Sequence, residues 1–437
     1  MRPRFRLPFR VSPFALALLS SMLGQAVFAQ DLDLRSPRIR QLWTELQAGT
    51  PNAEAKFFVS LTDGTPLVEP APVEPRHPEL VQSLVTFLWQ GQADTRKVVV
   101  QGGRPMDAEI PLVKLPGTQI WYRTELLPSD ASFAYWTSLD ANADIPDRIE
   151  ELQDLKDSPL DPLNSRSVGQ GTDAVSYVVL PQATPFPYRA KADTPKGRIV
   201  DETFTSQALK DTVALKVYLP ARPIAKGSRP WLLVAFDAGF EDMGTVLDNL
   251  IASGRIQPMV AVGIVNRPKK RPTDLGYSDP FAHFVADELI PWARKTYRTS
   301  ESRSKTILAG ESRGAGMASY VGLHYPHRIA KVISLSTALE NFPGTFPPAR
   351  FWLTGENGWL IERYMERPRQ PLEFYLAVGR LDTGPWTERL VNNRRFRDVL
   401  RLKGYKVHYN EWNGGHDPLF WQRGFIEGLT ALAPGSR

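Results

Sequence analysis

The most reactive arrangement in the sequence surrounds Ser312, which stands between Gly310 and Gly314 in a Gly-x-Ser-x-Gly pattern. An apolar run at 306–309 precedes the pattern, and a helical pattern follows it. So tight a strand-to-helix turn needs glycine neighbours, because larger side chains would collide with the strand and the helix. The pattern predicts a turn that lifts the Ser312 hydroxyl above a sheet, where a histidine can activate it as a nucleophile.

A serine nucleophile needs a general base and an acid, and two downstream loops supply candidates. Asp382 follows the apolar run 372–378, and His416 follows the run 406–412 in the loop Asn-Gly-Gly-His. Both lie just past predicted strands, where open α/β sheets place their sites. His416 would accept the serine proton and pass it to the leaving alcohol, and Asp382 would orient the imidazole. The order Ser, Asp, His is that of α/β-hydrolases.

Other residues compete for these roles. Asp398 lies in the following predicted helix, and Asp417 is adjacent to the histidine. Asp417 is better placed to cap the helix that begins at Pro418. The remaining histidines lack a Gly-Gly loop after a strand and are assigned to packing or surface positions: His77, His283, His324, His327 and His408. The sequence therefore favours Asp382 and His416.

An ester hydrolase also needs N–H donors for the negative charge that develops on the carbonyl oxygen. One is expected from the backbone of Arg313, the residue after the nucleophile. The second is expected near Gly239, in the loop after the apolar run 231–236, because glycine lets the backbone approach a substrate closely. An ordinary strand-to-helix turn is the alternative for this loop.

The order of the predicted elements indicates an α/β protein with two domains. Residues 31–156 combine a helix near 31–48 with short alternating strand patterns, among them 57–61, which is typical of a small antiparallel β-sandwich. Residues 157–197 are rich in proline, aspartate and glycine, which predicts an extended linker. Residues 198–437 alternate strands with helices, which predicts the mostly parallel sheet of an α/β-hydrolase fold. Its helical patterns fall near 245–253, 280–297, 314–326, 387–403 and 419–432.

Residues 1–29 have the features of a secretory signal peptide. Four arginines lie within the first ten residues, an apolar run follows near 14–23, and the small-residue sequence Val27-Phe-Ala29 ends the segment. The run is too short to cross a bilayer. We expect cleavage before Gln30, a periplasmic location and no stable membrane insertion; an uncleaved anchor is the alternative. The chain has no cysteine, which suits an oxidising compartment and excludes thiol catalysis.

The formal net charge is +6 at pH 7, and four of the positive charges belong to the predicted signal peptide. Charge therefore does not indicate a nucleic-acid binder. A local basic cluster, Arg267-Pro-Lys-Lys-Arg-Pro272, follows the predicted strand 259–265. Together with Arg313 it would form a basic rim for an anionic substrate; a solvated loop is the alternative. No histidine cluster has the spacing of a metal site, so no metal ligands are predicted.

Several motifs resemble the enterochelin (enterobactin) esterases, which hydrolyse catecholate trilactone siderophores. The segment 414–429, Gly-Gly-His-Asp-Pro-Leu-Phe-Trp-Gln-Arg-Gly-Phe-Ile-Glu-Gly-Leu, is similar to the family's segment around its catalytic histidine. Arg271-Pro-Thr-Asp-Leu275 resembles an Arg-x-x-Glu-Leu element of the family, and residues 287–291 match its following helix. Upstream, residues 64–70 and 161–164 are similar to parts of the family's N-terminal domain.

The resemblance implies a serine esterase that opens the ester bonds of ferric enterobactin or a related tri-catecholate. It implies Ser312 as the nucleophile, His416 as the base and Asp382 as the acid. It also implies Arg271 as a substrate contact, with Arg267 beside it in the basic cluster. No cofactor would be needed, since iron enters bound to the substrate.

The chain departs from the family pattern near the predicted substrate pocket. After the serine, Arg313-Gly-Ala replaces an apolar residue followed by Gly-Gly. At 336–341, Ser-Thr-Ala-Leu-Glu-Asn replaces Ser-Gly-Ser-x-Trp-Trp. Two other functions therefore stay open. One is a feruloyl or acetyl esterase of carbohydrates whose sandwich binds polysaccharide, and the other is a siderophore-binding protein without turnover.

Overall fold

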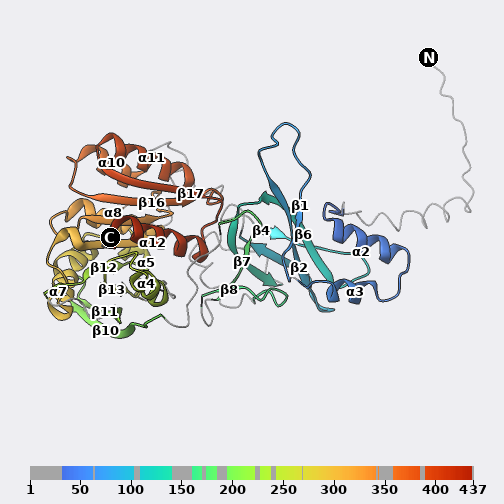
Figure 1. Ribbon diagram of the computed structural model, residues 1–437, viewed down its shortest axis with the longest axis horizontal. Helices are drawn as coiled ribbons and strands as arrows, with labels where there is room; N and C mark the ends of the chain where they lie inside the picture. The colour runs from blue at the N-terminus through green and yellow to red at the C-terminus, as the bar shows by residue number, and fades with distance from the viewer. Residues whose placement is uncertain are drawn as a thin grey trace, which may run out of the picture.

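The structure is a computed structural model that describes residues 32–62, 64–102, 109–139, 160–169, 174–184, 194–221, 227–237, 243–267, 269–340, 343, 358–383 and 389–435. These residues form an N-terminal β domain with two helices and a C-terminal α/β domain (Figure 1). The predicted signal peptide and Gly239 lie outside the described residues. Within the ranges given above, no helix combines the length and the apolar character needed to cross a bilayer.

The N-terminal domain is a sandwich of two antiparallel sheets. The first sheet has the strand order β1-β2-β6-β5 and the second has the order β4-β3-β7-β9-β8. The strands are β1 (Leu67–Pro70), β2 (Gln82–Gln90), β3 (Val98–Gln101), β4 (Glu109–Pro111), β5 (Val113–Lys114), β6 (Ile120–Pro128), β7 (Ser132–Leu139), β8 (Ser167–Val168) and β9 (Val175–Val179). Apolar side chains of both sheets, including Phe87 and Phe133, share one buried cluster. Packing of two sheets face to face confirms the predicted sandwich.

Two helices precede the first sheet, and one of them corrects a prediction. Helix α2 (Pro37–Gln47) begins at Ser36, whose hydroxyl accepts a hydrogen bond from the Ile39 N–H. Helix α3 (Ala53–Val59) occupies a segment where a strand was predicted at 57–61. Its Ala-Glu-Ala-Lys start favours a helix. Phe57 is buried in the cluster that joins the helices to the first sheet.

The segment 157–197 also differs from the extended linker predicted for it. Strands β8 and β9 lie within it, and β9 pairs antiparallel with β7 of the sandwich. The short run Val-Ser-Tyr-Val-Val forms β9, with hydrogen-bonding partners in β7 and β8. Flanking glycines and prolines made this segment look irregular, since local composition carries no information about a distant partner strand.

The α/β domain is built on an eight-stranded sheet with the order β10-β11-β13-β12-β14-β15-β16-β17. Its strands are β10 (Arg198–Ser206), β11 (Asp211–Leu219), β12 (Trp231–Ala235), β13 (Met259–Ile264), β14 (Thr306–Glu311), β15 (Lys331–Leu335), β16 (Glu373–Gly379) and β17 (Lys406–Trp412). Strands β10 and β11 are antiparallel to their neighbours, and pairing from β13 to β17 is parallel. The mostly parallel sheet of an α/β-hydrolase is therefore confirmed.

Helices cover both faces of this sheet, which explains why its central strands read as continuous apolar runs. Helices α4 (Met243–Ala252) and α12 (Pro418–Leu432) share a core cluster on one face. The other face carries α6 (Asp279–His283), the π-helix η4 (Phe284–Leu289), α7 (Ile290–Tyr297), α8 (Ser312–His324), α10 (Trp359–Glu366) and α11 (Arg389–Leu402). Short helical turns form α5 (Arg271–Asp274) and η5 (Arg303–Lys305). Helix α10 was not among the predicted helical patterns.

Candidate active site

Parallel pairing brings the three predicted catalytic residues to one edge of the large sheet. Strands β14, β15, β16 and β17 are successive parallel neighbours, so their carboxyl ends share that edge. Ser312 follows β14 directly, Asp382 lies just after β16, and His416 lies in the loop between β17 and α12. This edge is where open α/β sheets bind their ligands.

The turn at Ser312 has the geometry that the Gly-x-Ser-x-Gly pattern predicts. Ser312 is the first residue of α8 and has a φ angle of 51°, in the left-handed region. A Cβ atom on Gly310 would lie 2.3 Å from the carbonyl carbon of Gly314, so a larger residue cannot occupy that position. Ser312 is partly exposed, whereas the rest of α8 up to Leu323 is buried. The turn therefore leaves the serine partly exposed, whereas the helix that follows it is buried.

Backbone strain is concentrated along this edge. Asp237 after β12 has a φ angle of 52°, and Ser336 after β15 has a φ angle of 45°. With Ser312, these residues end three strands that are adjacent in the sheet order. Non-glycine residues with positive φ are uncommon and cluster at functional sites. The pattern supports a functional role for this edge independently of the sequence motif.

Asp382 and His416, the predicted acid and base, lie within hydrogen-bonding distance of each other. The Nδ1 atom of His416 lies 3.1 Å from Oδ2 of Asp382; the Asp382 side chain is fully buried, and 9% of the His416 side chain is exposed. If Nδ1–H donates to the carboxylate, Nε2 carries the lone pair that can accept a proton. Burial raises the pKa of Asp382, but the charges of His416 and Arg389 outweigh it and hold that pKa below its ordinary value. The hydrogen bonds of the described residues do not include one from Ser312 to His416, so that link remains a prediction.

A buried ion pair, which the sequence did not indicate, lies against this acid–base pair. Arg389 Nη1 lies 2.9 Å from Nδ1 and 3.2 Å from Nε2 of His416, and 3.5 Å from Oδ1 of Asp382. Its Nη2 donates to Oε1 of Glu340 at 2.7 Å. Burial and the Arg389 charge lower the pKa of His416, although Asp382 opposes them. The histidine is therefore held neutral, as a general base requires.

The two alternative acids have other roles. Asp398 is exposed on α11 and bonds to Arg397 at 2.7 Å. Asp417 caps α12, because its carboxylate accepts from the Phe420 N–H at 3.1 Å, as predicted. It also accepts from the Gly415 N–H at 3.2 Å. Burial raises the pKa of Asp417 to about 7 despite these donors.

The predicted substrate-binding arginines are engaged within the protein. Arg271 donates twice to the Asp237 carboxylate, at 2.8 and 2.7 Å. The Arg267 Nε donates to Asp274 at 2.9 Å, and Arg313 is buried, with 8% of its surface exposed. Contact of these residues with substrate stays a prediction, as does the direction of the Arg313 N–H. Within the described part of the chain, no group of three or more His, Cys, Asp or Glu residues is arranged to hold a metal.

Glu311, directly before the nucleophile, is buried at the same edge. Burial and the neighbouring Asp237 raise its pKa well above the ordinary value, although Arg271 opposes them. This shift favours the protonated, uncharged form of Glu311. An uncharged side chain here adds no negative charge beside Ser312, where an oxyanion is predicted to develop.

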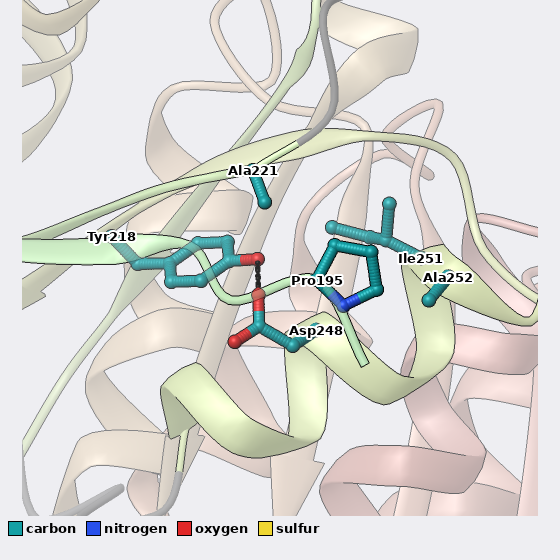
Figure 2. Close-up of a pocket in the computed structure, with 6 residues that line it drawn as sticks. All are labelled: Pro195, Tyr218, Ala221, Asp248, Ile251 and Ala252. Atoms are coloured by element: carbon teal, nitrogen blue, oxygen red, sulfur yellow. Dashed lines mark hydrogen bonds between the residues drawn. The ribbon is translucent and has the colours of Figure 1, made fainter. Parts of the chain in front are cut away.

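A small hollow lies away from these residues, between α4 and the end of β11. It is lined by Pro195, Tyr218, Ala221, Asp248, Ile251 and Ala252 (Figure 2). The Tyr218 hydroxyl donates to Asp248 at 2.6 Å, and the Gly197 N–H donates to the same carboxylate at 2.8 Å. Its cavity volume of about 10 Å³ is far below the roughly 300 Å³ at which ligand sites begin. These two hydrogen bonds connect Gly197 and β11 to α4.

Comparison with known proteins agrees with both domains. Residues 206–432 match the esterase family, and residues 84–188 match the family of enterochelin esterase N-terminal domains. The chain belongs to the enterochelin esterase family. The enzyme is accordingly an ester hydrolase.

Relatives of this esterase align along most of its length. The iron(III) salmochelin esterase of Escherichia coli O6:H1 is 28% identical over 80% of this chain and 87% of its own. The iron(III) enterobactin esterase of Dickeya dadantii is 25% identical over 85% of this chain and 91% of its own. A Shigella flexneri enterobactin esterase, crystallised with 2,3-dihydroxy-N-benzoyl-serine, superposes with a TM-score of 0.64 at 25% identity, covering 80% of this chain and 93% of that one.

Proposed function

We propose that this esterase hydrolyses the ester bonds of ferric enterobactin or a related tri-catecholate siderophore, which weakens iron binding and releases the metal. One observation carries the substrate assignment. The similarity to relatives named as iron(III) siderophore esterases runs through both domains, over 80% and 85% of this chain. A catalytic fold alone would not specify a substrate, whereas the N-terminal match is to enterochelin esterases in particular.

The proposed mechanism uses a Ser-Asp-His triad. The Ser312 hydroxyl attacks an ester carbonyl while Nε2 of His416 accepts its proton. Asp382 orients the imidazole through the 3.1 Å hydrogen bond and stabilises the imidazolium. The Arg313 N–H and an N–H near Gly239 stabilise the oxyanion. His416 then protonates the leaving alcohol, and water cleaves the acyl-enzyme to regenerate Ser312.

Iron is part of the substrate in this proposal, and the chemistry uses only protein groups. A ferric catecholate complex is anionic, so we propose Arg267, Arg271 and Arg313 as its contacts. Binding at Arg271 requires the substrate oxygens to share its guanidinium with Asp237, which already accepts two hydrogen bonds from it. A planar guanidinium has five N–H donors, enough to serve both partners.

We propose a periplasmic location on the basis of residues 1–29. The arginine-rich start, the apolar run and the small residues before Gln30 support export and cleavage. Sequencing of the protein purified from the periplasmic fraction should give Gln30 as the first residue. An uncleaved chain recovered from the cytoplasm would contradict the proposal.

Product analysis tests the substrate assignment against the two alternatives. The purified protein is incubated separately with ferric enterobactin and with a feruloyl ester, and the products are separated by chromatography. Linear trimer from the first substrate supports the proposal. Ferulate alone supports a carbohydrate-ester hydrolase. Tight binding of the ferric complex without any product supports a siderophore-binding protein.

A further inference from the structure

The loop that carries His416 lies at the junction of the two domains. The Ser132 N–H of β7 donates to the carbonyl of Asn413 at 3.0 Å, and the Asn413 amide donates to Asp130 at 2.6 Å. A Cβ atom on Gly414 would lie 3.2 Å from the Ser132 carbonyl oxygen and 2.9 Å from Phe420 Cδ2. The β-sandwich thus bonds directly to the backbone of the base loop.

Asp417 joins three parts of the molecule through one carboxylate. It accepts from Gly415 in the base loop and from Phe420 in the first turn of α12. The backbone N–H of Ala134, in β7 of the sandwich, lies near enough to this carboxylate to lower its pKa. Asp417 is 2% exposed, so water could not readily accept hydrogen bonds from these N–H groups if the carboxylate were removed.

Apolar contacts extend the junction to the acid loop. Leu419 of α12 is buried together with Ala134 and Tyr177 of the sandwich. Leu381, the residue before Asp382, packs against the core between the two sandwich sheets. The Leu381 N–H donates to the Gly414 carbonyl at 3.1 Å, which links the acid loop to the base loop.

We propose that the N-terminal β-sandwich is a positioning part of the catalytic apparatus, with Asp417 as its principal link to the base loop. It holds the loops of Asp382 and His416 at the geometry that proton transfer requires, and so governs turnover rather than substrate affinity alone. Displacement of a catalytic group by about 1 Å lowers rates about 100-fold. This inference rests on the proposed hydrolytic role of Ser312, Asp382 and His416.

The test compares full-length variants on two esters at pH 8, where Asp417 is ionised. The small ester p-nitrophenyl acetate reports on the acid–base geometry, and ferric enterobactin adds substrate binding. Asp417→Asn should lower kcat about 100-fold on both esters with little change in KM. Asp130→Ala removes one hydrogen bond to Asn413 and should lower kcat about threefold to tenfold on both.

The matched control is Asp94→Ala, which changes an exposed aspartate of the same domain and should leave both rates unchanged. Circular dichroism shows whether each variant folds. If Asp417→Asn does not fold, the kcat of Asp130→Ala tests the inference. Normal p-nitrophenyl acetate turnover with a raised KM for the siderophore would overturn the inference, because the sandwich would then only bind substrate. Wild-type rates in both variants would overturn it too. If the wild-type enzyme hydrolysed neither ester, the proposed function on which this inference rests would be refuted instead.

Discussion

The two sides of the candidate site are held in place in different ways. The nucleophile side is built within the catalytic domain, where Gly310 and Gly314 pack closely beneath Ser312. The base side is held from outside that domain, where Ser132 of the β-sandwich bonds to the loop that carries His416. The nucleophile side of the site therefore depends on a short local sequence, and the base side depends on the docking of two domains.

Removal of the nucleophile tests the first half with the largest expected effect. Ser312→Ala should lower kcat about 10⁶-fold with little change in the thermal midpoint, since Ser312 is small and partly exposed. Rates on p-nitrophenyl acetate and calorimetric melting measure both quantities. Ser302→Ala, at an exposed serine, is the control. Substantial turnover by Ser312→Ala would mean that another nucleophile acts.

Asp382→Asn tests the second half. An amide in place of the carboxylate favours the wrong imidazole tautomer, and kcat should fall about 10⁴-fold. Asp398→Asn, on the exposed side of α11, should keep the wild-type rate. If the two variants lost activity equally, or if neither did, the assignment of Asp382 as the acid would be wrong.

Gly310→Ala distinguishes local packing from domain docking. The added methyl would lie 2.3 Å from the Gly314 carbonyl carbon, and such overpacking destabilises by about 1–3 kcal/mol. We expect a lower melting temperature together with a loss of activity. Gly322→Ala, in the following helix α8, meets only side chains, at 3.2 Å or more, and serves as the control. An active, fully stable Gly310→Ala enzyme would show that the turn is not sterically constrained.

Arg389→Gln should give the smallest effect, visible in the pH profile. Three charged groups act on His416: Arg389 lowers its pKa, whereas Asp382 and Glu340 raise it. Loss of the cation should raise the pKa, so the acidic limb of kcat/KM moves to higher pH and activity at pH 6 falls on the order of tenfold. Arg389→Lys should keep the limb near its wild-type position. An unshifted limb in Arg389→Gln would exclude this electrostatic role.

The comparison also explains which parts of the site could be predicted from the sequence. Ser312 could be predicted because glycines flank it at positions 310 and 314. Asp417 could be predicted as a cap because Pro418 follows it. Arg389 was not recognised, since nothing distinguishes it from the other arginines of its helix until the fold brings it to His416. Glu340 was also not recognised, because no sequence pattern indicates that the fold places it beside Arg389. The contact between the loops of Asp382 and His416 depends on the pairing of β16 with β17, which no local sequence pattern specifies.

The three left-handed residues at the strand ends have a consequence for heat resistance. Strained conformations of this kind store about 1–3 kcal/mol each, and glycine at Asp237 or Ser336 would relieve part of that strain. No such exchange is open at Ser312, because the nucleophile would be lost with it. A more heat-resistant variant could therefore relax the backbone after β12 and β15 but not at Ser312, so the turn at Ser312 would remain the strained part of this edge.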